Sequence, residues 1–167
     1  VYLVRGLTAY DVSHEVTNYT EAEYFKMSDL QEVRVNVSSP GGSQSAHLFQ
    51  DATGKWEVDG LGDAPIDESR VRALLIAVRS GRMVRPVGKT IRPEFGLGNP
   101  RARVTMKNKD EEMELLVGSD IGDFTYVKVN TKPDVILVRK YTLDALLRFN
   151  KEQLIDRSQM GSGAETQ

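Results

Sequence analysis

The chain has 167 residues, of which 40% are hydrophobic and 28% are charged, a composition typical of a soluble globular protein with one domain or two very small ones. Its 22 basic and 24 acidic residues leave a net charge of -2, which gives no reason to expect a nucleic-acid binder. The absence of cysteine excludes disulfides, thiolate catalysis and cysteine-based zinc sites.

Both ends of the sequence suggest a piece of a longer protein. No initiator Met or signal-type segment precedes the first strand-like residues, and residues 161–167 form a small, polar segment that predicts a flexible tail. Residues 1–5 (VYLVR) recur as residues 135–139 (VILVR), identical at four of five positions. We therefore interpret residues 1–28 as the end of a preceding repeat unit, or as an N-terminal strand and short helix, and residues 29–160 as the main α+β module.

The first half of this module predicts three strands and a helix. Valines alternate with polar residues over 32–39, turn signals follow at 39–43 and 51–54, and further strands are expected at 46–50 and around Trp56. Asp67 is a good helix N-cap, and the spacing of the next apolar residues predicts one buried stripe. Gly81 is expected to end this helix in the left-handed conformation. The stripe consists of Val71, Leu74, Leu75 and Val78.

The second half repeats this arrangement. After a loop at 92–100, alternating patterns predict strands at 103–107, 113–117, 124–129 and 135–138, and Thr142 is expected to cap a short helix. Gly96, Pro100 and Gly118 are assigned structural roles in turns. The sequence therefore predicts an α+β fold in which two antiparallel β-meanders are each followed by a helix, with the helices packed on one face of the sheet or sheets.

A series of short motifs resembles a bacterial family. These are residues 54–58 (GKWEV), 94–100 (EFGLGNP), 103–106 (RVTM), 116–118 (LVG), 125–127 (TYV) and 154–157 (LIDR). Their order is similar to that in domain-of-unknown-function family 4340, over about residues 29–160, although Ile155 replaces the first arginine of the final motif. The resemblance implies an extracytoplasmic domain, in the periplasm or on the outer face of the inner membrane, tethered by a segment outside this chain. It also implies repeated copies, an association with gliding-motility-type ABC transporter components, and no known catalytic residues.

The strongest local charge asymmetry lies between residues 70 and 92, where seven bases occur without an acid. Such a stretch could bind acidic lipid headgroups, an anionic polysaccharide or an acidic protein surface. The alternative is a solvated helix face and loop that pairs with nearby acids. The seven residues are Arg70, Arg72, Arg79, Arg82, Arg85, Lys89 and Arg92.

The sequence patterns at the other candidate sites indicate structural roles, and no catalytic, cofactor-binding or metal-binding residue is predicted. The glycines at 96–100 precede a strand and indicate a tight turn, whereas a phosphate loop would open a helix. The acids at 110–114, Asp120 and Asp123 lack the spacing of a calcium loop. The histidines, His14 and His47, have no recognisable catalytic partners. Trp56 is interpreted as a core anchor, with a ligand platform as the alternative.

We therefore expect a non-enzymatic interaction or scaffold module of a membrane-tethered, transporter-associated envelope protein. Its expected partner is a protein of the cell envelope, without nucleic acid or cofactor, and with membrane contact only through an anchor outside this sequence. The repeat would also allow self-association by strand exchange. The alternative is a ligand-binding domain for a carbohydrate or an anionic surface, using a cleft between the meanders or the basic stretch 70–92.

Overall fold

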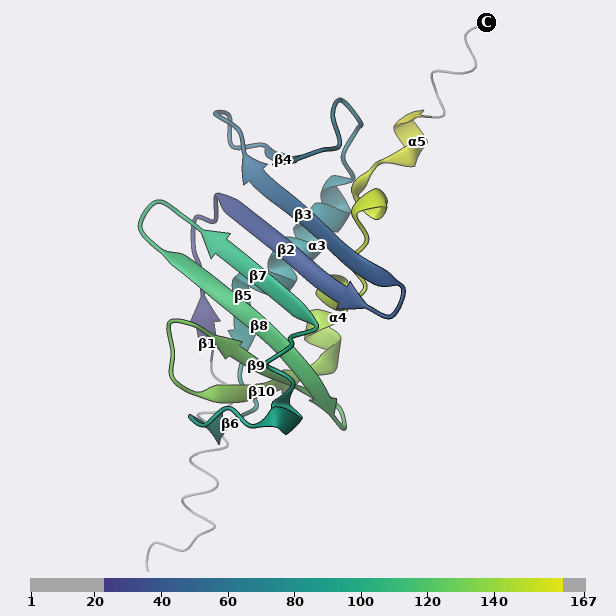
Figure 1. Cartoon of the computed structure of the whole chain (residues 1–167). Coiled ribbons are helices and arrows are strands. Elements are labelled where there is room, and N and C mark those ends of the chain that lie inside the picture. The colour runs from purple at the N-terminus through teal and green to yellow at the C-terminus, as the bar shows by residue number, and fades with distance from the viewer. Residues whose placement is uncertain (1–22, 161–167) are drawn as a thin grey trace, which may run out of the picture.

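The computed structural model describes residues 23–160 (Figure 1). The strands are β1 (Glu23–Lys26), β2 (Glu32–Ser39), β3 (Gly42–Gln50), β4 (Trp56–Val58), β5 (Ser80–Arg82), β6 (Arg85–Gly88), β7 (Ala102–Lys107), β8 (Glu112–Ile121), β9 (Phe124–Val129) and β10 (Val135–Arg139). The helices are α3 (Glu68–Arg79), α4 (Asp144–Leu147) and α5 (Arg157–Met160), with 3-10 helices η1 (Pro93–Phe95), η2 (Lys140–Leu143) and η3 (Lys151–Leu154).

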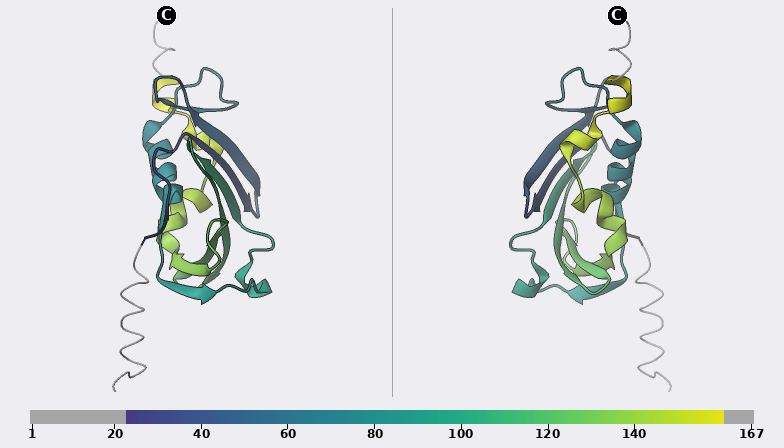
Figure 2. Two further views of the ribbon diagram at one scale, coloured as in Figure 1. Left: turned by 90° about the vertical axis from the view of Figure 1, so that its left-hand side faces the viewer. Right: turned by 90° about the vertical axis from the view of Figure 1, so that its right-hand side faces the viewer.

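Within these residues, eight strands form one antiparallel sheet in the order β4-β3-β2-β7-β8-β9-β10-β6, and β1 pairs with β5 in a separate two-stranded sheet. The helices α3 and α4 lie on one face of the large sheet, while η1 lies on the other side (Figure 2). The predicted α+β class with antiparallel strands and helices on one face is confirmed.

The two predicted meanders form a single sheet. β2 pairs with β7 along its length, with Val35 opposite Val104, so the two halves are joined by a continuous hydrogen-bonded ladder. Backbone pairing therefore leaves no cleft along the β2–β7 ladder in the described residues, and a ligand-binding cleft between the meanders stays a prediction.

Helix α3 has the predicted start and buried stripe but a different end. The Asp67 carboxylate accepts hydrogen bonds from the backbone N–H groups of Ser69 (3.0 Å) and Arg70 (3.2 Å), which satisfies donors of the first turn. The four stripe residues are all buried. Gly81, however, is not in the left-handed region; it lies in β5, and a Cβ at this position would overlap the ring of Phe25. Gly81 thus provides space, and the predicted left-handed helix end is wrong.

The main core lies between the helices and the inner face of the large sheet. Residues at the start of the described chain belong to it, because Tyr24, Phe25 and Met27 are buried there. The described part of segment 1–28 is therefore packed into the main module. The predicted repeat at residues 1–5, His14 and the tail 161–167 lie outside the described residues.

A second, smaller cluster covers part of the outer face, where Phe95 and Leu97 pack on Tyr126, Val135 and Leu137. Gly96 ends η1 with φ 68°, and Pro100 is half-buried just before β7. Gly118 lies directly beneath this loop, where a Cβ would overlap the carbonyl oxygen of Phe95.

The C-terminal helical region differs slightly from the expected one. Thr142 lies inside η2, and its hydroxyl donates to the Arg139 carbonyl (2.7 Å), while α4 begins at Asp144. The predicted cap at Thr142 is therefore wrong, although Leu143 and Leu146 are buried as expected. None of the helices in the described part is long and apolar enough to cross a membrane.

Candidate ligand-binding groove

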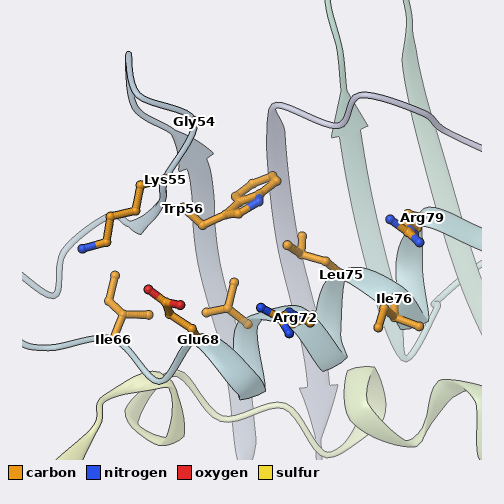
Figure 3. A pocket seen from close by; sticks show the side chains of 10 residues that line it. Gly54, Lys55, Trp56, Ile66, Glu68, Arg72, Leu75, Ile76 and Arg79 are labelled. Carbon is orange, nitrogen blue, oxygen red and sulfur yellow. The ribbon is translucent and has the colours of Figure 1, made fainter.

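Three adjoining pockets share the side chain of Trp56, and we refer to them together as the Trp56 groove. The first has a volume of about 440 Å³ and lies between α3 and the segment that carries Lys55 and Trp56 (Figure 3). The second, of about 550 Å³, shares Trp56, Leu75 and Arg79 with the first. The third, of about 430 Å³, shares Lys55 and Trp56. Each volume falls in the range of small-molecule sites.

A tight turn positions Trp56 at the edge of the sheet. The Asp51 carboxylate accepts hydrogen bonds from the backbone N–H groups of Thr53 (2.8 Å) and Lys55 (3.1 Å), and Gly54 adopts φ 84°. Hydrogen bonds from the Thr53 side chain and backbone hold the pKa of Asp51 below its usual 3.8. This turn leads into β4, where Trp56 pairs with Gln50 of β3.

The indole of Trp56 has two environments. It is half-buried and packs against the main core, as expected for an anchor, and it also lines all three pockets. Figure 3 shows the ring extending over α3 toward Leu75. The alternative of a ligand platform therefore has a structural basis in the exposed part of the ring.

Helix α3 supplies the other wall of the first pocket. Its exposed residues Arg72, Ile76 and Arg79 follow one another at helical spacing along the groove (Figure 3), and Ile76 is 55% exposed. In the described part of the chain, Lys55, Arg72 and Arg79 form no ion pair and no side-chain hydrogen bond. The pocket thus combines three cations without ion-pair partners, one acid (Glu68) and an apolar floor.

The structure distributes the residues of the predicted basic stretch over several elements. The structure places Arg72 and Arg79 in the groove and adds Lys55, which lies outside that stretch. Arg70 instead pairs with Asp67 (3.3 Å) and Arg92 with Glu94 (3.7 Å). The remaining bases are Arg82 in β5, Arg85 in β6, which is the opposite edge strand of the large sheet, and Lys89 just after it.

Further clusters of polar side chains lie on strands β2 and β3 and on the β7–β8 hairpin. His47 is half-buried in β3, with its Nε2 2.9 Å from Glu32 and its Nδ1 3.7 Å from Asp59; Glu32 also pairs with Arg34 (3.0 Å). In the described residues, no group of three or more histidine and acidic side chains is arranged to hold a metal ion. The predicted acids at 110–114 form part of a hairpin, where Asp110 lines the second pocket of the groove and Glu114 pairs with Arg103 (3.3 Å).

Asp120 belongs to a local network between β8 and β9. Its carboxylate accepts hydrogen bonds from Arg101 (2.5 Å) and Thr125 (2.7 Å) and lies 3.2 Å from the ammonium of Lys140. Burial opposes ionisation of Asp120, but these three partners outweigh it and hold its pKa below 3.8. The network ties the end of β8 to the residue before β7, to β9 and to η2, which is a structural role.

Comparison with known proteins identifies a family for this chain. The family model described as "Domain of unknown function (DUF4340)" matches residues 56–160. No curated protein and no solved structure matches the chain. The matched segment begins at Trp56 and includes all of α3, whereas strands β2 and β3 and the pocket residues Gly54 and Lys55 precede it.

Proposed function

The chain belongs to the DUF4340 family, and we propose that it is a non-enzymatic interaction module of a membrane-tethered envelope protein that holds an anionic partner in the first pocket of the Trp56 groove. One observation carries this proposal. Lys55, Arg72 and Arg79, none of them ion-paired in the described structure, line the same pocket as the half-exposed indole of Trp56.

Electrostatics supports an anionic partner. Three cations and one acid leave the first pocket with an excess of positive charge, and an anion bound there would accept charge-assisted hydrogen bonds from guanidinium and ammonium groups. Ile76, Leu75 and Trp56 would contribute apolar contact area beside these bonds. A partner that combines an acidic group with an apolar face fits this lining best.

The chemistry of the lining supports binding over catalysis. The groove presents an indole, side-chain amides, four cations and five carboxylates, one of which lines the first pocket, and the described residues that line it include no histidine. The envelope setting, the membrane tether and the association with transporter components follow from what the family resemblance implies. A protein partner in the envelope stays a prediction, which the following experiment tests directly.

Site-specific photo-crosslinking in intact cells tests the proposal. A photoreactive residue at Ile76, on the groove rim, is compared with one at Ile121, which is similarly exposed (55% and 44%) but lies at the β8–β9 turn. We expect adducts from position 76 that disappear when Arg72→Gln and Arg79→Gln are combined, and none from position 121. Equal adducts from both positions would contradict the groove, and full-length protein found only in the cytosol would contradict the envelope setting.

A further inference from the structure

We infer that a second, apolar pocket between the helices and the large sheet binds the chain of a free fatty acid, whose carboxylate pairs with Arg82 at the pocket's rim. This pocket, which we call the core pocket, has a volume of about 270 Å³. It shares one lining residue, Ile76, with the Trp56 groove. The inference goes beyond the proposed function, because the two sites would hold different ligands.

The interior of the core pocket is lined by apolar residues of the main core. Leu115 of β8, Val127 of β9 and Val138 of β10 come from three neighbouring strands of the large sheet. Phe25 of β1 and Leu143 of η2 also line it, and all five side chains are at most 5% exposed. Three neighbouring strands span about 10 Å, so the lining extends across the sheet, as a linear apolar chain requires.

The volume of the core pocket sets the length of the chain that it can hold. An apolar protein cavity of about 150 Å³ is large enough for benzene, with its six carbon atoms. At roughly 25 Å³ for each carbon, the 270 Å³ of the core pocket would hold about ten carbons. One medium-length acyl chain therefore fills the pocket, and the two chains of a phospholipid exceed it.

The exposed rim of the core pocket supplies one cation. Arg82 of β5 lines the pocket, and in the described part of the chain its side chain has no ion-pair or hydrogen-bond partner. The hydroxyl of Thr142, also on the rim, already donates to the Arg139 carbonyl (2.7 Å). Arg82 is therefore the rim side chain that can donate to an anion, and a guanidinium binds a carboxylate through two parallel hydrogen bonds.

The charges around the core pocket favour a ligand with a single negative charge. Among the described residues, no carboxylate lines the pocket. Glu23 lies opposite Arg82 in the pairing of β1 with β5, but the two form no ion pair in the described structure and Glu23 does not line the pocket. One cation at the end of an apolar interior complements the charge distribution of a fatty acid, whereas an uncharged alcohol would leave Arg82 without an anion.

Calorimetric titration of the full chain with straight-chain fatty acids, each below its micelle concentration, tests the inference. We expect saturable binding whose affinity rises about fourfold for each added methylene, up to about ten carbons, and then levels off. Decanol, which carries no charge, should bind at least about tenfold more weakly than decanoate. An affinity that keeps rising to tetradecanoate would indicate surface adsorption and overturn the site, and equal affinities for decanol and decanoate would overturn the fatty acid.

Matched variants locate the binding. Arg82→Gln is expected to weaken decanoate binding about tenfold and to leave decanol binding unchanged, whereas Arg85→Gln, at an exposed arginine of β6, should change neither. Ala77→Leu enlarges a residue that lines the pocket and should weaken both ligands at least about tenfold. Ala73→Leu, at an exposed position one turn earlier on α3, is its control and should leave binding unchanged. Circular dichroism verifies that each variant is folded.

Methyl NMR of the unmodified sequence gives an answer that depends on no variant. Decanoate should shift the methyl signals of Leu115, Val127 and Val138, and leave those of Leu48, in β3 on the other half of the sheet, unchanged. Binding without shifts at the three pocket residues, or equal weakening by Arg82→Gln and Arg85→Gln, would overturn the site. If no chain length binds, the inference fails, while the proposed anionic partner of the first pocket is unaffected.

Discussion

Replacing Gly118 by alanine should detach the loop that covers the outer face of the sheet. Gly118 lies in β8 beneath η1, where a new Cβ would overlap the carbonyl oxygen of Phe95 and lie 3.1 Å from the Cδ2 of Leu97. The obstructing atom is backbone, so no side-chain rotation relieves the overlap. Either the loop or the strand must move.

The cost follows from what the loop buries. Phe95 and Leu97 are 3% and 5% exposed, and burying one such side chain contributes about 1.5–3 kcal/mol. Complete lifting of the loop would therefore cost about 3–6 kcal/mol, because two such side chains become exposed. Partial relaxation reduces this figure, so we expect Gly118→Ala to lower the free energy of unfolding by about 2–4 kcal/mol.

Urea denaturation followed by circular dichroism measures this change, and hydrogen exchange over residues 92–100 shows whether the loop opens. Gly98→Ala is the matched control, because nothing lies within 4 Å of a Cβ at Gly98, and it should change stability by less than about 0.5 kcal/mol. If Gly118→Ala unfolds at the same urea concentration as Gly98→Ala, the close approach of the loop is not as described.

Three further substitutions test other contacts. Gly81→Ala should cost about 1–3 kcal/mol in urea unfolding, because a Cβ would displace the ring of Phe25; an unchanged midpoint would contradict that packing. Burial and the nearby Asp134 charge raise the pKa of Tyr24 from 10.0 to about 12. The free energy of unfolding of the wild type should therefore fall as the pH rises from 10.0 to about 12, and that of Tyr24→Phe should not fall for this reason. Parallel curves of unfolding free energy against pH for the two proteins would refute this. The lowered pKa of Asp120 stabilises the fold above pH 3.8, and this contribution is lost in acid. Asp120→Asn should therefore lower the free energy of unfolding by about 1–2 kcal/mol at neutral pH and lose less stability than the wild type in acid. A series of thermal melts in which the variant loses as much stability in acid as the wild type would disprove this.

Local patterns were sufficient to predict the elements that carry regular apolar spacing. Helix α3 follows from Asp67 and a stripe at helical period, and β2 follows from alternating valines, because in both cases one face must be buried. Strands β5 and β6 were not predicted. Their residues include Gly81, Arg82 and Pro86, which show no such alternation, and their pairing depends on β1 and β10.

The groove could not be predicted because its residues come from distant parts of the sequence. Trp56 and Arg79 are brought together by α3 packing beside β4, and Gln31 reaches the same place from the start of β2. The charge run at 70–92 includes two of the three cations of the first pocket, Arg72 and Arg79. It could not separate Arg72 and Arg79 from Arg85, because helix geometry and sheet order decide which bases face the groove.

The pairing of β2 with β7 has a consequence for how the chain acquires its structure. The two strands are separated by about sixty residues, so their ladder closes a long loop before it gains any hydrogen bonds. During synthesis β2 and β3 leave the ribosome before β7, so the edge of β2 that pairs with β7 stays unpaired until β7 has emerged. Slow, late closure of the sheet is therefore expected, and a chaperone that shields this edge during synthesis would raise the yield of native protein.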